Sequence, residues 1–114
     1  MNILYVENHS IFATNAVRQF LSRHKVTIVS SLAAAREALA SKSFEVALID
    51  YDLDDGKGDE LVREICSRSN RVVVIAASSH DEGNAALRRA GASAICAKAE
   101  FDQIQNVIDG VANG

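Results

Sequence analysis

The residue types that could do chemistry in this chain follow three apolar segments. They are Glu7, Asn8, Asp50, Asp52 and Lys98. Carboxylate and amide oxygens suit a hard divalent cation such as Mg²⁺, which needs only one or two protein carboxylates. A carboxylate can also attack a phosphoryl group when a metal and a fixed cation neutralise the phosphoryl oxygens. The alternative is a solvated acidic loop with a surface lysine, because charged residues are common where strands end.

The apolar pattern predicts five strands that alternate with five helices. The strands are expected at 3–6, 26–29, 46–49, 72–77 and 93–97, and the helices at 11–23, 32–40, from 59, from 79 to 90, and over 101–111. Ser30 and Ser31 offer an N-cap, Ser79 and Glu82 match a capping box, and Gly91 is a predicted helix end. Short connections between alternating elements favour a five-stranded parallel sheet with helices on both faces.

In such a sheet the strands all end at one edge, where ligands bind. Asp50 ends the strand at 46–49, whose four apolar residues indicate burial on both faces. Glu7, Asn8, residues 76–78 and Lys98 follow other strands, so we expect their side chains to lie beside Asp50.

Composition limits the classes of protein that this chain can represent. Its 114 residues are expected to form a single domain, 1–114, with a net charge of −3 and scattered basic residues, which disfavours direct nucleic-acid binding. There is no apolar run of about 18 residues and no signal-peptide pattern, so we expect a cytoplasmic protein without a membrane segment. Cys66 and Cys96 are expected to be buried free thiols.

Two further motifs compete for the acidic segment. The spacing of Asp50, Asp52 and Asp54 imitates an EF-hand, but Asp55 and Leu61 stand where that loop needs Gly and Glu. Asp50 and Asp52 also match the start of haloacid-dehalogenase-like phosphatases. In that family the motif follows the first strand of a larger domain with a cap, so this reading is a remote alternative.

The segments 3–9 and 50–61, the turn at 91–92 and the segment 95–98 together resemble the receiver domain of two-component response regulators, over the whole chain. The resemblance implies a flavodoxin-like (βα)5 architecture in a phosphoacceptor signalling domain that is not a classical enzyme. It implies phosphotransfer from a phosphohistidine to Asp50, with Lys98 contacting the phosphate. Glu7, Asn8, Asp50 and the backbone carbonyl of Asp52 would bind Mg²⁺.

This sequence departs from the family pattern at positions that matter for signalling. Asn8 replaces an acidic metal ligand, so Mg²⁺ should bind more weakly. Ala76 stands where the family has Thr or Ser, and Ile95 where it has the switch aromatic. Ser78 would substitute for the missing hydroxyl only if its loop were remodelled.

The resemblance therefore supports two functions. The first is phosphorelay signal transduction with a sensor histidine kinase or phosphotransfer protein as partner. The second is a phosphorylation-independent pseudo-receiver that acts as a protein-interaction module. In either case a downstream protein is expected on the face of the last helix, and homodimerisation is left open.

Overall fold

The computed structural model describes residues 1–68 and 71–112, which are organised around a five-stranded sheet in the order β2-β1-β3-β6-β7. The strands are β1 (Asn2–Val6), β2 (Lys25–Val29), β3 (Val46–Ile49), β6 (Val73–Ala76) and β7 (Ala94–Ile95). Every neighbouring pair in this sheet is parallel, which confirms the predicted fold class. The strand expected at 93–97 is shorter than predicted, because only two residues pair with β6.

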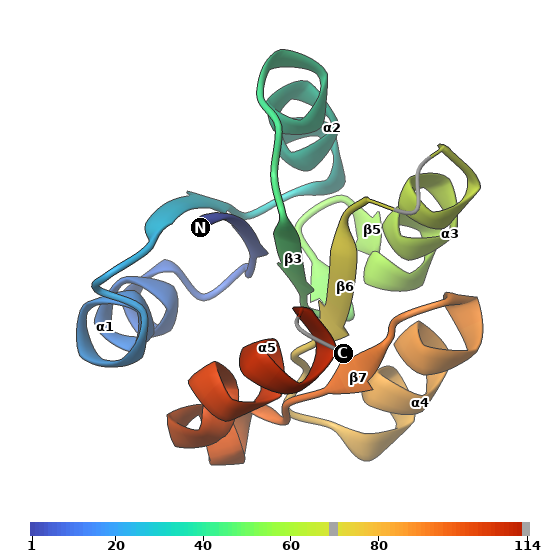
Figure 1. Ribbon diagram of the computed structural model, residues 1–114. Coiled ribbons are helices and arrows are strands. Elements are labelled where there is room, and N and C mark those ends of the chain that lie inside the picture. Colours follow the sequence, from blue (N-terminus) through green and yellow to red (C-terminus); the bar gives the residue numbers. More distant parts are fainter. Residues whose placement is uncertain (69–70, 113–114) are drawn as a thin grey trace.

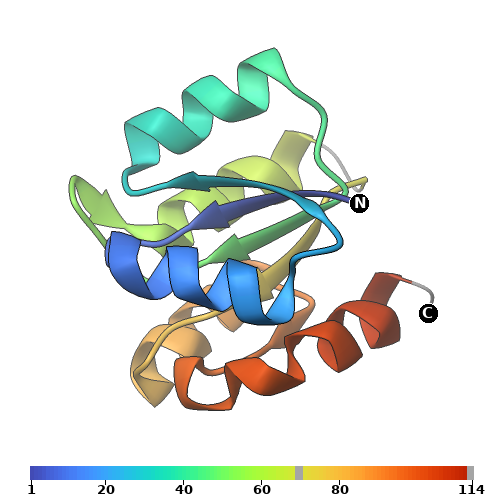
Figure 2. The same cartoon turned by 90° about the vertical axis from the view of Figure 1, so that its left-hand side faces the viewer.

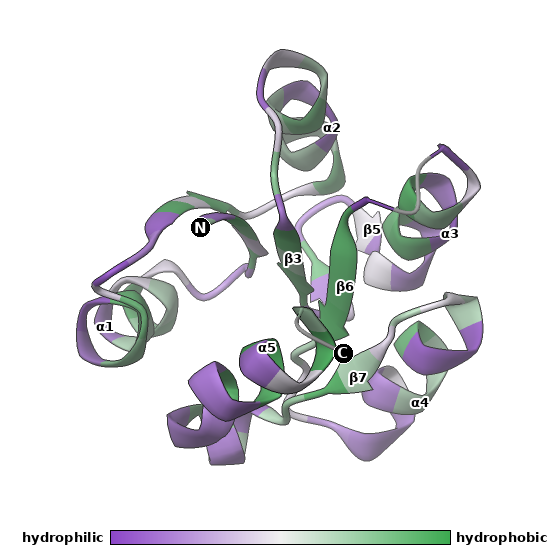
Figure 3. Ribbon diagram, viewed as in Figure 1, coloured by the Kyte–Doolittle hydropathy of each residue, from purple (hydrophilic) through white to green (hydrophobic). Residues whose placement is uncertain are grey.

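Five α-helices cover the two faces of the sheet (Figure 1). They are α1 (Ser10–Phe20), α2 (Leu32–Ser41), α3 (Gly58–Arg68), α4 (Asp81–Ala90) and α5 (Ile104–Ala112). Helices α1 and α5 pack on one face, and α2, α3 and α4 pack on the other, as Figure 2 shows from a second side. Side chains alternate along β1, so Tyr5 packs in the core beneath α1 and α5, and Leu4 packs in the core beneath α2, α3 and α4. The central strands are accordingly apolar throughout, while the helices carry polar outer faces (Figure 3).

The helix ends agree with the sequence in two places and differ in two. The Ser31 hydroxyl accepts a hydrogen bond from the Ala34 amide, and Gly91 ends α4 at a φ of 129°, which favours glycine. Helix α1 ends at Phe20 rather than at residue 23. The predicted capping box at Ser79 is wrong, because α4 begins one residue later with His80 as N-cap and without a side-chain cap bond.

Two elements were not predicted. The acidic segment after β3 forms a hairpin of β4 (Asp52–Leu53) and β5 (Gly56–Lys57), and a 3-10 helix, η1 (Lys98–Gln103), precedes α5. The Asp55 carboxylate accepts hydrogen bonds from the amides of Leu32 at 2.6 Å and Ala33 at 3.0 Å. The hairpin is thereby attached to the start of α2, where a negative charge is favourable.

The predicted burial of the two cysteines is right for one and wrong for the other. Cys96 is buried, but Cys66 is exposed on α3. The Cys66 sulfur lies against Gly91, which has no side chain to cover the thiol. A Cβ added to Gly91 would lie 2.8 Å from this sulfur.

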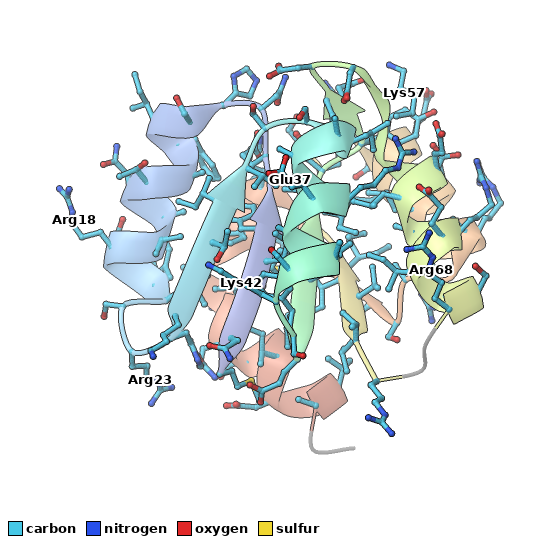
Figure 4. The ribbon with its side chains drawn as sticks, turned by 90° about the horizontal axis from the view of Figure 1, so that it is seen from above. Arg18, Arg23, Glu37, Lys42, Lys57 and Arg68 are labelled. Atoms are coloured by element: carbon cyan, nitrogen blue, oxygen red, sulfur yellow. The ribbon has the colours of Figure 1, made fainter. Side chains whose placement is uncertain are left out.

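Within residues 1–68 and 71–112, none of the helices combines the length and the apolar character needed to cross a bilayer. Charged side chains project from several elements at both ends of the sheet (Figure 4). Lys57 extends from the hairpin at the end where the strands terminate, and Arg23 lies at the opposite end.

Candidate functional site

An acid and lysine cluster lies where β1 and β3 end. The Lys98 Nζ is 2.9 Å from Glu7 Oε1 and 3.7 Å from Asp50 Oδ2. Glu7 follows β1, Asp50 follows β3, and Lys98 opens η1 shortly after β7. The structure thus brings together three of the side chains that the sequence placed at this edge, because parallel strands end on the same side of a sheet.

The orientation of the Asp50 carboxylate is fixed by its surroundings. Asp50 is 4% exposed, and its Oδ1 accepts a hydrogen bond from the Tyr51 amide at 2.8 Å. The other oxygen, Oδ2, is the one that faces Lys98. Gly58 is required beside it, since a Cβ there would lie 2.0 Å from the Asp50 carbonyl oxygen. The backbone around Asp50 is therefore held by close packing as well as by hydrogen bonds.

Glu7 is a fully buried carboxylate with two polar partners. Its Oε2 accepts a hydrogen bond from the His9 amide at 3.0 Å, and its Oε1 faces the Lys98 ammonium. Burial raises the pKa of Glu7 above its ordinary value, while Lys98 and the His9 amide act in the opposite direction. A buried carboxylate needs a cation nearby, and Lys98 supplies one here.

Asn8 presents an oxygen that suits a metal ion. Its Oδ1 is buried and has no hydrogen-bond partner among the described residues. No group of three His, Cys, Asp or Glu side chains in the described part of the chain gathers closely enough to hold a metal. Mg²⁺ nevertheless needs only one or two carboxylates beside waters and neutral oxygens. Glu7, Asn8 and Asp50 therefore fit this ion, although their two carboxylates and one amide oxygen carry less negative charge than three carboxylates would.

The acidic residues after Asp50 are engaged elsewhere. The Asp52 carboxylate forms an ion pair with Lys57, whose ammonium also lies 5.2 Å from the Tyr51 ring centroid. Asp55 caps α2, as described above. Of the four aspartates from 50 to 55, the Asp50 side chain is therefore the one that contacts the cluster, and Asp52 is left with its backbone carbonyl as a candidate ligand.

The two atypical positions lie on the α4 side of the site. Ala76 is fully buried and carries only a methyl group, and Ile95 is 43% exposed on β7. Ser78, the candidate replacement for the missing hydroxyl, accepts a hydrogen bond at its Oγ from the His80 amide at 3.2 Å. Asn84 fixes the same loop by accepting from the Ser78 amide at 2.9 Å and donating to the Ser78 carbonyl at 3.0 Å.

Two contacts of the site were missed in the sequence. The Lys98 ammonium lies 5.0 Å from the centroid of the Phe12 ring, at the start of α1. Asn84 is 3% exposed although its helix otherwise buries small or apolar side chains. An Asn on the inner stripe of a helix is a signal that could have indicated a buried partner, whereas nothing in the sequence distinguishes Phe12 from a core residue.

The fold and this cluster define a class of protein: a doubly wound α/β domain with a carboxylate and lysine site at the carboxyl ends of its strands. The sequence matches the response regulator receiver domain family over residues 3–109, so the chain belongs to that family of two-component signalling domains. Receiver domains are phosphoacceptor signalling modules rather than classical enzymes, and they typically bind Mg²⁺ and work with a histidine kinase. No curated protein matches the chain in sequence.

Solved structures agree with this assignment at the level of the fold. A CheY-like receiver domain from Methanospirillum hungatei is 19% identical with a TM-score of 0.87, covering 98% of this chain and 93% of that one. The receiver domain of a sensor histidine kinase from Pseudomonas aeruginosa, with magnesium in its active-site cleft, is 22% identical with a TM-score of 0.84, covering 99% and 98%. A Burkholderia pseudomallei response regulator with a phosphorylated aspartic acid, calcium and citrate is 20% identical with a TM-score of 0.83, covering 98% and 68%.

Proposed function

We propose that residues 1–114 act as one receiver domain in which Asp50 accepts a phosphoryl group from a histidine kinase or phosphotransfer protein. The observation that carries this proposal is the position of the Lys98 ammonium, within 4 Å of both Glu7 and Asp50. In the transfer, an Asp50 oxygen attacks phosphorus, the new P–O bond forms, and the P–N bond to the donor histidine breaks. The Tyr51 amide orients the attacking carboxylate, and Lys98 neutralises a phosphoryl oxygen.

The metal ligands in this proposal are Glu7, Asn8, Asp50 and the backbone carbonyl of Asp52. A bound Mg²⁺ would supply positive charge to the transferring phosphoryl group. Because Asn8 contributes a neutral oxygen, the site carries less negative charge than a site with a third carboxylate, and we expect weak binding.

The proposal is tested by incubating the protein with Mg²⁺ and acetyl phosphate and measuring its mass. A gain of one phosphoryl group in the wild type and none in Asp50→Asn is the expected result. The matched control is Asp54→Asn, because Asp54 is exposed on the same hairpin and has no part in the cluster. A gain that persists in Asp50→Asn would contradict the assignment of the acceptor.

The second candidate is the pseudo-receiver, which Ala76 and Ile95 favour. Neither side chain can perform the hydroxyl or aromatic part of the usual switch. The exposed Ile95 lines a pocket of about 320 Å³ with Asn84, Cys96 and Val107, between α4 and α5. This is the face of the last helix on which a downstream protein would dock in either function. Absence of phosphorylation together with absence of Mg²⁺ binding at millimolar concentration would favour this second function over the first.

A further inference from the structure

The Lys98 ammonium contacts three groups, so a movement towards one of them weakens its contacts with the other two. It lies 2.9 Å from Glu7 Oε1, 3.7 Å from Asp50 Oδ2 and 5.0 Å from the Phe12 ring centroid. A cation over an aromatic face is attracted by the ring quadrupole. A phosphoryl group on Asp50 adds negative charge on the Asp50 side, so the ammonium is drawn away from Glu7 and Phe12.

The α4 side of the site has little means of responding to such a group. Ala76 offers no hydroxyl, and Ile95 is already on the surface. The loop between β6 and α4 is held by Asn84, which bonds to the Ser78 amide and carbonyl, and the Ser78 carbonyl also accepts a hydrogen bond from the Lys98 amide at 3.1 Å. A new charge on Asp50 therefore finds no hydroxyl at position 76 and no aromatic ring at position 95 to draw towards it.

The α1 side, in contrast, is connected to Lys98 by ring contacts. Phe12 meets Phe101 edge to face at 6.1 Å, and Phe101 meets Phe20 at 6.2 Å. Phe101 lies in η1, the 3-10 helix that Lys98 opens, so the side chain and the backbone of Lys98 both lead to this ring. A pocket of about 500 Å³ between α1 and η1 is lined by Phe12, Phe20, Lys98 and Phe101 among others, which leaves room for the rings to rearrange.

We propose that phosphorylation of Asp50 is transmitted to α1 and η1, by withdrawal of Lys98 from Glu7 and from the Phe12 ring, and not to α4 and β7. This inference rests on the proposed phosphorylation of Asp50. The resemblance to receiver domains implies a different response, a change of shape at α4, β7 and α5.

The test is an NMR experiment on the full chain with Mg²⁺, with and without beryllium fluoride as the phosphoryl mimic. Fluorine signals report whether the mimic binds, and backbone amide shifts report where the protein responds. We expect shift changes beyond the site to concentrate in residues 10–20 and 98–104, with small changes in 81–95. Large amide shift changes in residues 81–95 without changes in α1 would overturn this inference but would still support phosphorylation of Asp50. Absence of a bound fluoride signal would overturn both.

A pair of variants tests the role of the ring directly. Phe12→Leu keeps an apolar side chain but removes the quadrupole that holds Lys98, so the mimic should bind about two- to fivefold more tightly and the α1 response should shrink. Ile11→Ala is the matched control, because Ile11 is 79% exposed on the same turn. Equal affinity and an equal α1 response in wild type and Phe12→Leu would overturn the inference.

Discussion

Lys98 lies closer to Glu7 than to Asp50, with its Nζ 2.9 Å from Glu7 Oε1 and 3.7 Å from Asp50 Oδ2. Each carboxylate accepts one backbone amide, from His9 and Tyr51 respectively, but Glu7 is fully buried while Asp50 is slightly exposed, so Glu7 has the stronger need for a cation. The site thus holds an internal positive charge, and the ligands that remain for a metal are few and include the neutral Asn8.

Asn8→Asp should increase the affinity for Mg²⁺ about tenfold or more, which corresponds to about 1.4 kcal/mol of binding free energy. A carboxylate in place of the amide adds a negative charge beside Glu7 and Asp50, and Mg²⁺ prefers charged oxygen ligands. Isothermal titration calorimetry measures the change. Asn2→Asp, at the exposed start of β1 and so at the opposite end of the sheet, adds the same charge away from the cluster, and an equal increase there would contradict the assignment of Asn8 as a ligand.

Asn84→Ala should lower the free energy of unfolding by about 1 to 3 kcal/mol, because it leaves the buried Ser78 amide without a partner and the Ser78 carbonyl with the Lys98 amide alone. Urea denaturation measures this loss, and hydrogen exchange should become faster at residues 77–80. Asn106→Ala is the control, since Asn106 is exposed on α5 and its replacement should change stability by less than about 0.5 kcal/mol. Similar stabilities of the two variants would show that the Asn84 bonds contribute little.

Two glycine substitutions should have opposite effects on the melting temperature. Gly58→Ala places a Cβ 2.0 Å from the Asp50 carbonyl oxygen and 3.0 Å from Ile49 Cγ2, so we expect a loss of more than about 2 kcal/mol and a disturbed acceptor site. Gly110→Ala meets no atom within 4 Å and lies in α5, where alanine is favoured by up to about 1 kcal/mol. A Gly58→Ala protein as stable as the wild type would contradict the close packing at Asp50.

Asp50→Asn should abolish modification and leave the fold intact. The amide oxygen can still accept from the Tyr51 amide, and the substitution removes the repulsion between the carboxylates of residues 50 and 7. Thermal and urea unfolding compare the variant with the wild type. A loss of stability above about 1.4 kcal/mol, a tenfold change in the folding equilibrium, would count against this expectation.

The two cysteines should differ in their reaction with iodoacetamide. Burial raises the pKa of Cys96 from 9.0 to about 11, so its thiol stays protonated at pH 8, where the thiolate is the reactive form. Mass spectrometry of the native protein should show one modification, at the exposed Cys66, and two after denaturation. Cys66→Ser should show none in the native state.

The same raised pKa sets the sign of the pH dependence for Cys96. The folded state favours the protonated thiol, so its contribution to stability is complete below the ordinary pKa of 9.0 and is lost as the pH rises towards 11. Native Cys96 that reacts as fast as Cys66 at pH 8 would contradict its burial.

Local patterns in the sequence determined most of the secondary structure and the position of Asp50. The apolar run at 46–49 predicted a doubly buried strand, and Ser31 and Gly91 predicted helix ends, because each depends on neighbouring residues only. The alternation of strands and helices requires the strands to end on one edge, which places residues 7, 50 and 98 together.

The tertiary structure decided the features that depend on partners distant in the sequence. The sequence predicts an acidic loop around Asp55, but this residue caps α2; it also predicts that Cys66 is buried, but Cys66 lies over a glycine that cannot cover it. The preference of Lys98 for Glu7, and its contact with Phe12, follow from how deeply each group is buried when the helices pack on the sheet. Periodicity gives the face on which a side chain lies, but only packing fixes the extent of its desolvation and therefore the choice of its charged partner.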